Sequence, residues 1–519
     1  MLIQEITMDQ ATDSTATPAF GFRIACLIAG PVAALLMYLF MQPDDPSMIE
    51  APLTGGGIVV ASLMIWMAIW WLTEAVDIAV TALLPVIILP LFGAVGMNQV
   101  VAPYADKLIF LFAGGLLIAL SLHKWKLDQR IALLALRTIG PSPGRMIAGF
   151  MIVTAVLSSF VSNTATTAMM LPLAMGIVEL AEEGTPHAGR SRFAVALLLA
   201  IAWSASIGGT CTIIGTFPNG IAVGFLEQEY GVSISFLQWS MMTVPIAIIM
   251  LPITWWILVR LLYRPEPMDN SRSGAFLQER LDRLGPMSRG EKVTIIVFCL
   301  TAACWIFRPS LQEFFPGLND GIIGITGGLV LFIIPIDPKR NQFAMDWKTA
   351  RNLPWGIFIL LGGGLSLAAG VKATGLSEHM ASLIDDMAGF PEVIIILLIV
   401  TGIVFLTELT SNTATTATFV PILAALSVPL GIAPVELVIP ATIAASCAFM
   451  MPVATPPNAI VFGSGRLTVP LMCRGGFFMN ILAMVVVTMA AFTTVRWVVS
   501  NHFDPGTGTP VAMTGSEGR

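Results

Sequence analysis

Charged residues are scarce in this chain of 519 residues, where Asp, Glu, Lys and Arg together make up 11%. Soluble domains carry about 25%, so this chain has too little charge to cover a large soluble core. Hydrophobic residues make up 56%, and the mean hydropathy is +0.84. Apolar runs of about 20 residues, the length that crosses a bilayer as a helix, recur along the chain. The composition therefore predicts a polytopic membrane protein.

Residues that support metal or nucleotide chemistry are also few. There are four histidines, and none of them begins an H-E-x-x-H motif. The six cysteines show no metal-site spacing, and most lie in apolar runs, so we expect small core side chains. Neither glycine-rich stretch, 114–115 or 362–364, precedes the lysine of a phosphate-binding loop. These absences argue against an intramembrane enzyme.

One stretch of small polar residues occurs twice. Residues 162–168 and 411–417 both read Ser-Asn-Thr-Ala-Thr-Thr-Ala, and they lie 249 residues apart. Matches at one offset indicate an internal duplication that kept a polar cluster within apolar sequence. The same offset relates three further pairs: Gly114-Gly115 with Gly363-Gly364, Pro172 with Pro421, and His123 with Lys372.

The apolar runs predict an all-α protein with about 11 transmembrane helices and two re-entrant hairpins. Basic residues concentrate in cytoplasmic loops, and the segments 124–145, 263–290 and 337–352 are rich in Lys and Arg. Basic segments flank residues 146–182 on both sides, which predicts a hairpin entering from the cytoplasm, whereas 391–428 is expected to enter from outside. The spans are expected at about 22–41, 55–72, 78–95, 107–122, 193–226, 238–262, 292–307, 320–336, 354–371, 434–464 and 470–499.

Two of these spans have polar centres that do not suit a plain helix. Span five is interrupted by Gly208–Asn219, which is crowded with Gly, Thr and Pro, and span ten is interrupted by Ala454–Asn458. Each is expected to form two half-helices with an unwound centre, although a simple kink is the alternative. If successive spans cross the bilayer in alternate directions and the basic loops lie in the cytoplasm, the two copies have opposite orientations. Inverted-topology repeats with broken helices 5 and 10 are typical of secondary transporters.

The hairpin tips and unwound centres are expected to converge, because irregular backbone within a bilayer must be buried or face a water-filled cavity. Hydroxyl and amide groups offer donors and acceptors, helix N-termini suit carboxylates, and freed carbonyls suit Na⁺. Helix packing is the alternative role for Ser-Asn-Thr, but two copies in inverted hairpins favour a binding site. Glu408 lies beside the second motif, where a functional role and a structural salt bridge both remain open.

At these residues the sequence resembles the divalent anion/sodium symporter family, the Na⁺-coupled dicarboxylate and citrate carriers. The resemblance covers nearly the whole chain after residue 50, and rests on the two Ser-Asn-Thr tips and on Thr455-Pro456-Pro457-Asn458. It implies a homodimer in which a transport domain slides against a dimerising scaffold, as an elevator. The sequence departs from the family pattern at Thr216-Phe217-Pro218-Asn219, where Pro-Pro-Asn is usual, and this leaves the local shape open.

The resemblance also implies roles for individual residues. The substrate carboxylates would contact Ser162, Asn163, Thr164, Ser411, Asn412, Thr413, Thr455 and Pro456. The first sodium site would use Ser158, Ser162, Asn163 and Gly209. The second would use Thr407, Thr410, Asn412 and Ala454, several of them through backbone carbonyls. No Lys or Arg lies in either motif, which favours sodium coupling over the fixed basic residue of exchangers.

The expected function is Na⁺-coupled symport of C4-dicarboxylates such as succinate, malate or fumarate, with no enzyme activity. Na⁺, the dicarboxylate, the lipid bilayer and a second copy of the chain are the expected partners, and no nucleic acid is expected. A Na⁺-independent dicarboxylate exchanger, a carrier of citrate, sulfate or another small anion, and a channel remain alternatives. Gradient-driven, saturable accumulation separates a carrier from a channel.

We expect location in the plasma membrane, specifically a bacterial inner membrane, with the first apolar run retained as a span. The N-terminus is expected in the cytoplasm and the C-terminus outside. The expected regions are 1–21 as a cytoplasmic N-terminal segment, 22–123 as scaffold helices 1–4, 124–262 as transport region with the first hairpin and helices 5–6, 263–290 as cytoplasmic linker, 291–371 as scaffold helices 7–9, 372–499 as transport region with the second hairpin and helices 10–11, and 500–519 as an extracytoplasmic tail.

Overall fold

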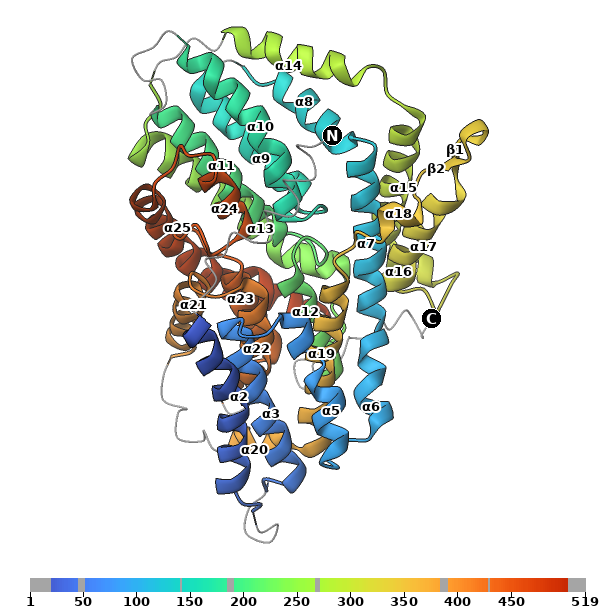
Figure 1. Ribbon diagram of the computed structural model, residues 1–519, viewed down its shortest axis with the longest axis vertical. Helices are drawn as coiled ribbons and strands as arrows, with labels where there is room; N and C mark the ends of the chain where they lie inside the picture. Colours follow the sequence, from blue (N-terminus) through green and yellow to red (C-terminus); the bar gives the residue numbers. More distant parts are fainter. Residues whose placement is uncertain are drawn as a thin grey trace, which may run out of the picture.

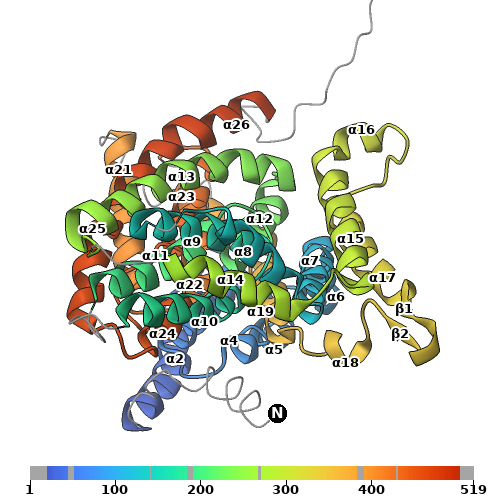
Figure 2. The same cartoon turned by 90° about the horizontal axis from the view of Figure 1, so that it is seen from above.

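The protein is almost entirely helical (Figure 1 and Figure 2). The computed structural model describes residues 20–44, 52–140, 142–183, 191–266, 271–382, 391–427 and 430–502. Within these ranges the only sheet is a hairpin of β1 (Pro335–Asp337) and β2 (Gln342–Phe343). The expected all-α class is therefore confirmed. Residues 1–19 and 503–519, which include most of the two expected terminal segments, lie outside the described residues.

Helices that can cross a bilayer run through the whole described chain. Five shorter apolar helices accompany the long ones, and they include one arm of each hairpin. Large apolar side chains on these helices point outward: Ile152, Ile248 and Leu398 are each more than half exposed, as expected for side chains that face lipid. The long stretches are Phe20–Phe40, Gly55–Thr73, Met97–Lys124, Asn163–Glu182, Arg192–Gly209, Phe236–Leu262, Trp355–Thr374 and Val469–Asn501.

The third expected span is not one helix. The structure divides it into α4 (Ile78–Thr81) and α5 (Leu84–Leu91). Pro85 occupies the first turn of α5, and proline has no N–H to bond the carbonyl four residues earlier. A helix continuing from α4 would lose that bond, so the chain begins a new helix instead. The prediction of a single helix over 78–95 was wrong at this point.

The internal duplication is visible in the order of elements. The first copy has a hairpin of α9 (Pro143–Ser158) and α10 (Asn163–Glu182), and then a broken helix of α11 (Arg192–Gly209) and α12 (Phe217–Tyr230). The second copy has α21 (Glu392–Thr407) and α22 (Asn412–Ser427), followed by α23 (Pro434–Ala445) and α24 (Pro456–Phe462). Both expected hairpins are therefore confirmed, and both spans are broken as expected. The first break, at 210–216, lies within the predicted Gly208–Asn219, but the second lies at 446–455 and not at Ala454–Asn458, whose last three residues begin α24.

Each copy closes with a long helix that ends in a π-helical turn. These helices are α13 (Phe236–Trp256), which continues into η2 (Ile257–Leu262), and α25 (Val469–Ala490), which continues into η5 (Ala491–Val495) and α26 (Arg496–His502). The remaining elements are α2 (Phe20–Phe40), α3 (Gly55–Thr73), α6 (Met97–Val101), η1 (Ala102–Ala105), α7 (Lys107–Lys124), α8 (Leu127–Arg137), α14 (Ser271–Leu284), α15 (Arg289–Ile306), α16 (Arg308–Gln312), α17 (Asp320–Ile333), η3 (Pro338–Arg340), α18 (Trp347–Ala350), α19 (Trp355–Thr374) and α20 (Leu376–Ser382).

The repeated glycine pairs allow helices to pack closely. A Cβ atom at Gly114 of α7 would lie 2.0 Å from the backbone of Gly324 in α17, and one at Gly363 of α19 would lie 2.2 Å from the carbonyl oxygen of Ala82. Neither backbone could accept a side chain at that distance. The glycines at these two positions therefore serve close helix packing.

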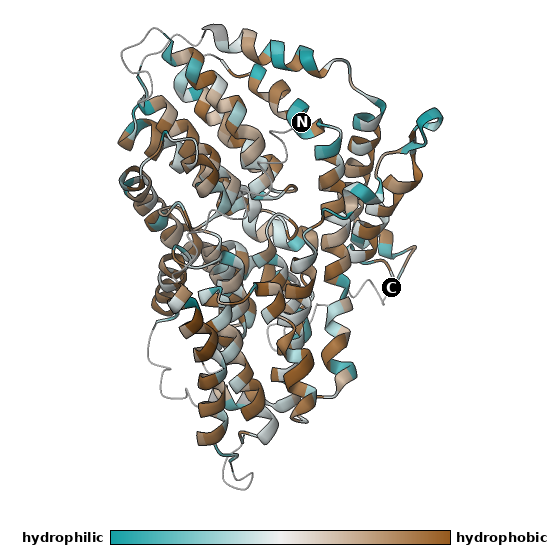
Figure 3. Ribbon diagram, in the orientation of Figure 1, coloured by the Kyte–Doolittle hydropathy of each residue, from teal (hydrophilic) through white to brown (hydrophobic). Residues whose placement is uncertain are grey.

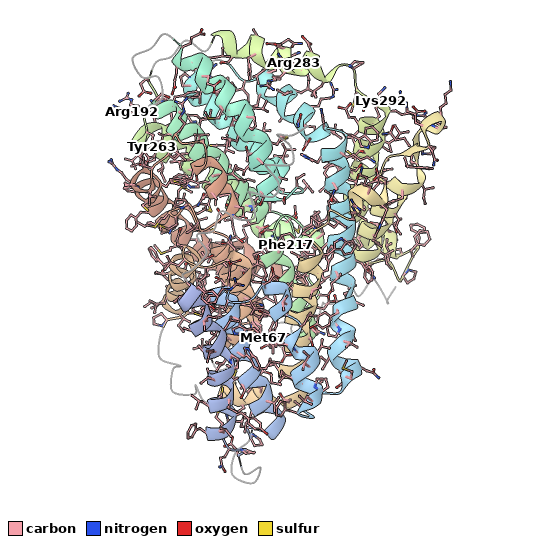
Figure 4. The ribbon with its side chains drawn as sticks, in the orientation of Figure 1. Met67, Arg192, Phe217, Tyr263, Arg283 and Lys292 are labelled. Atoms are coloured by element: carbon pink, nitrogen blue, oxygen red, sulfur yellow. The ribbon has the colours of Figure 1, made fainter. Side chains whose placement is uncertain are left out.

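Hydrophilic residues gather at one end of the molecule, along α14 and around the neighbouring helix ends (Figure 3). Arg192, Arg283 and Lys292 all lie toward this end, whereas Phe217 lies near the middle (Figure 4). The segment 263–290 was expected only as a linker, but it contains α14, an amphipathic helix that packs on α8 with Leu277 buried. Its charged residues on one face mark it as a surface helix.

Candidate functional site

The first hairpin turns within four residues between α9 and α10. Ser162 is the N-cap of α10, and its hydroxyl accepts a bond from the N–H of Ala165 at 3.3 Å. The hydroxyl of Ser158, at the end of α9, lies 2.6 Å from Asn163 Oδ1 and 2.8 Å from the carbonyl oxygen of Ala205 in α11. This turn is therefore tied to the broken helix through a hydroxyl that is fully buried.

The second hairpin repeats this arrangement. The hydroxyl of Thr407 lies 2.8 Å from Asn412 Oδ1 and 2.7 Å from the carbonyl oxygen of Ala445, the last residue of α23. Thr410 bonds to Thr415 at 2.7 Å and to the carbonyl of Leu406. A hydroxyl, an amide oxygen and a helix-end carbonyl thus meet at each tip, and oxygen atoms of this kind are the ligands that a hard cation requires.

The two unwound centres are held by matching asparagines. The side-chain amide of Asn219 donates to the carbonyl oxygens of Gly209 at 3.1 Å and Thr212 at 2.7 Å. That of Asn458 donates to Ala448 at 3.2 Å and Met451 at 3.0 Å. Each asparagine follows the break in its own copy and is fully buried. The departure at Phe217 therefore leaves this bonding pattern unchanged.

The tip of the first hairpin touches the first break directly. A Cβ atom at Gly209 would lie 2.4 Å from Asn163 Oδ1, so only glycine leaves room for the asparagine side chain. The hydroxyl of Ser159 donates to the carbonyl oxygen of Gly208 at 3.0 Å, and the backbone carbonyl oxygen of Ser159 accepts a bond from the hydroxyl of Thr212. Three of the four residues expected at the first sodium site, Ser158, Asn163 and Gly209, therefore meet at one place.

The two copies pack across one another. Helix α10 of the first hairpin packs against α24 of the second break, and α22 of the second hairpin packs against α12 of the first break. Figure 1 shows α9 and α10 in the upper half of the molecule and α22 in the lower half. This crossing places each hairpin beside the interrupted helix of the other copy. Among the described residues, no hydrogen bond joins the side chains of 162–164 to those of 411–413.

The other expected residues lie around these contacts. Thr455 is the N-cap of α24 and accepts a bond from the N–H of Asn458 at 3.4 Å, and Pro456 is the first residue of that helix. Ala454 is buried, and its N–H bonds the carbonyl of Met451 at 3.2 Å. Thr164, Ser411 and Thr413 are partly exposed, which suits side chains that would meet a ligand.

The sequence did not single out several groups that hold this region together. The carbonyls of Ala205 and Ala445 were not expected as partners, because their role depends on packing between helices. The Pro-Asn pair that recurs after each break is the sequence signal that could have identified Asn219 and Asn458 as matching structural residues. Glu408 forms no salt bridge among the described residues; its carboxylate bonds to backbone N–H groups instead.

Two re-entrant hairpins packed across two interrupted helices define a polytopic membrane protein with the architecture of an inverted-repeat secondary transporter. The family model described as the sodium:sulfate symporter transmembrane region matches residues 31–500. The chain belongs to this family, as the resemblance of its motifs implied.

Two relatives with high coverage support the same assignment. The chain is 40% identical over 482 residues to a protein of Staphylococcus saprophyticus named sodium-dependent dicarboxylate transporter SdcS, covering 91% of each chain. It is 38% identical over 483 residues to the protein of that name from Staphylococcus aureus strain USA300, covering 92% of each.

Solved structures share the fold at much lower identity. The YdaH transporter of Alcanivorax borkumensis aligns with a TM-score of 0.55 at 12% identity, over 92% of this chain and 97% of its own. MtrF of Neisseria gonorrhoeae aligns with a TM-score of 0.53 at 13% identity, over 91% and 95%. These likenesses bear on the fold alone.

Proposed function

We propose that the protein is a Na⁺-coupled symporter of C4-dicarboxylates. The observation that carries this proposal is the repeated contact of a hydroxyl, an asparagine oxygen and a helix-end carbonyl at the two tips. The relatives' name, sodium-dependent dicarboxylate transporter, supplies the substrate class. A carrier of this kind binds and releases its cargo unchanged, so no catalytic residue is assigned.

One sodium ion would bind at each tip. The first would lie among Ser158, Ser162, Asn163 and Gly209, and the second among Thr407, Thr410, Asn412 and Ala454. The carbonyl groups released where α11 and α23 end carry partial negative charge, which favours a cation. The hydroxyl of Ser158 or Thr407 would turn a lone pair to the ion, since it can donate to only one neighbour at a time.

The dicarboxylate would bind between the tips. The first intrahelical bonds of α10 and α22 run from Thr166 to Ser162 and from Thr415 to Ser411, so the N–H groups just before them have no helical partner. Such N–H groups and the positive end of the helix dipole attract a carboxylate. The proposed substrate ligands are Ser162, Asn163, Thr164, Ser411, Asn412, Thr413, Thr455 and Pro456.

Coupling follows from charge. No Lys or Arg lies in residues 158–168 or 407–417, so a doubly charged anion between the tips depends on the bound cations for neutralisation. Each Na⁺ would raise the affinity for the anion, and the anion would raise the affinity for Na⁺ by the same factor. A site holding only Na⁺ or only the anion would gain a net charge from its ligand, which is costly to move through a bilayer.

We further propose an elevator movement in a homodimer. Residues 124–262 and 372–499 would move as the transport domain against a scaffold of 22–123 and 291–371. The basic end that bears α8 and α14 would face the cytoplasm, because loops rich in Lys and Arg stay on that side. In this orientation the N-terminus would lie inside the cell and the C-terminus outside.

A competition panel on the purified protein in proteoliposomes tests the substrate assignment. Uptake of labelled succinate is measured against unlabelled succinate, malate, fumarate, citrate and sulfate, each with Na⁺ and with choline. We expect the C4-dicarboxylates to compete in Na⁺ and little uptake in choline. Sulfate is the alternative substrate, because the matching family model is described as a sodium:sulfate symporter. If sulfate inhibits uptake and the C4-dicarboxylates do not, the proposed substrate is sulfate instead of a dicarboxylate. Equal uptake and trans-stimulation in choline would indicate an exchanger.

A further inference from the structure

Glu408 is a buried carboxylate at the end of the first arm of the second hairpin. It is the C-cap of α21 and only 4% exposed. Its Oε1 accepts bonds from the N–H groups of Phe449 at 2.7 Å and Met450 at 2.9 Å, and its Oε2 accepts one from Met451 at 2.9 Å. Three consecutive amides of the unwound segment between α23 and α24 therefore point at one side chain.

Two further contacts fix this segment from other sides. Asn480 of α25 donates to Glu408 Oε1 at 2.9 Å, and Trp203 of α11 donates to the carbonyl of Phe449 at 3.1 Å. A Cβ atom at Gly476 would lie 2.3 Å from that same carbonyl oxygen. The carboxylate thus joins the second hairpin, the second break and the last long helix at a single buried point.

The matching position in the first copy has no charge. Ser159 stands there, and its hydroxyl bonds to the carbonyls of Ala155 and Gly208. The amides of Thr210 and Cys211 in the first break bond to carbonyls of the preceding turn. The amides of Ser446 and Cys447 do the same at the start of the second break, and an asparagine holds each break. The second break differs in that an acid also accepts bonds from its amides. The two halves of the site differ in what maintains their shape.

We propose that Glu408 is a positioning residue for the second sodium site, an inference that rests on the proposed function. The N–H of Met451 bonds Glu408, and its carbonyl accepts bonds from Ala454 at 3.2 Å and Asn458 at 3.0 Å. The acid thereby sets the course of the backbone that leads to Ala454 and Thr455. Thr407 and Thr410, two other residues of that site, flank it in sequence.

The charge of Glu408 has a second consequence for a cation. Among the described residues no Lys, Arg or His pairs with it, and it occupies a helix C-terminus, where the helix dipole already disfavours an anion. Its backbone N–H partners offset the cost of burial, but they leave the negative charge in place. A cation bound at the second tip would be attracted by this negative charge, whereas the matching position of the first copy is the uncharged Ser159. We therefore expect the second site to be the tighter of the two.

Binding of Na⁺ without substrate, followed by thermal unfolding of purified protein in Na⁺ against choline, tests this inference. Glu408→Gln keeps the size of the side chain but removes the charge and turns an NH₂ group toward N–H donors. We expect the Na⁺ midpoint to rise roughly tenfold, the effect of losing hydrogen bonds to a charged group. Maximal uptake at saturating Na⁺ should be largely retained, which a merely structural defect would not give.

Two further variants complete the design. Asn480→Ala removes one donor and leaves the acid in place, so it should raise the midpoint by a smaller factor, about threefold. Ser159→Ala changes the matching position in the first copy and should leave the tighter midpoint unchanged. If Glu408→Gln does not fold, the Asn480→Ala variant tests the inference in its place. The inference is overturned if the Na⁺ midpoint of Asn480→Ala is unshifted, or if that variant also fails to fold.

The inference and the proposed function fail in different ways. A wild-type protein that Na⁺ does not stabilise contradicts the proposed function and the inference together. A wild-type protein that responds to Na⁺, with an unchanged midpoint in Glu408→Gln or an equal shift in Ser159→Ala, contradicts the inference alone.

Discussion

The hydroxyl of Ser158 lies 2.6 Å from Asn163 Oδ1, and this contact closes the turn of the first hairpin. Thr407 and Asn412 repeat it at 2.8 Å in the second hairpin. In both copies the same hydroxyl also reaches a carbonyl of the adjacent broken helix. The duplicated hydroxyls therefore tie each hairpin to the broken helix of its own copy.

Removing one of these hydroxyls should weaken Na⁺ binding. Thr407→Val keeps the shape of the side chain but removes an oxygen at the second tip. We expect the Na⁺ concentration for half-maximal uptake to rise about tenfold, or about 1.4 kcal/mol. Thr254→Val is the control, because that hydroxyl is buried and bonds only its own helix at Met250. Equal Na⁺ dependence of the two variants would contradict the assignment.

A methyl group at Gly209 should disturb the first tip. Its Cβ would lie 2.4 Å from Asn163 Oδ1, so the asparagine must move and lose its contact with Ser158. Gly209→Ala is expected to lower uptake at limiting Na⁺ by about tenfold, as in other overpacked sites. Gly402→Ala in α21 is the matched control, since nothing lies within 4 Å of that position. An active Gly209→Ala variant would show that this contact is dispensable.

The ion pair of Arg130 and Glu291 should be important for stability. It joins α8 to the start of α15, and both residues are buried, at 8% and 3% exposure. Arg130→Met leaves an unpaired buried acid, which typically costs about 3–5 kcal/mol, and should lower the melting temperature by several degrees. Arg283→Met breaks an exposed pair with Glu279 and should cost at most about 1 kcal/mol. Similar melting temperatures for the two variants would be inconsistent with this role.

Asp346 gives a contribution to stability that depends on pH. Burial raises the pKa of this carboxyl, but hydrogen bonds from Lys124 and Thr349 outweigh it and leave the pKa below its ordinary value. A depressed pKa stabilises the folded state above the unfolded pKa of about 3.9, and the effect is lost as pH falls through the lower folded value. The carboxylate is half exposed, so the effect is below about 1 kcal/mol. Asp346→Asn should be less stable than wild type at pH 7, and this difference should shrink below pH 4.

Much of the fold could be predicted from hydrophobic runs, loop charge and the repeated motif, because a bilayer leaves few choices for the backbone. The hairpins and both broken helices follow from these signals. Pro85 is the signal for the division of span three, and the amphipathic pattern of residues 271–284 is the signal for α14. The carbonyls of Ala205 and Ala445 and the amides around Glu408 could not be inferred, because backbone partners depend on how helices pack.

Uptake of labelled succinate by wild-type protein in proteoliposomes, driven by an inward Na⁺ gradient, tests Na⁺-coupled transport most directly. We predict transient accumulation above the external concentration, which collapses when the Na⁺ gradient is dissipated. Uptake that is unchanged when K⁺ or choline replaces Na⁺ would contradict the proposal that bound Na⁺ neutralises the charge of the anion between the two tips.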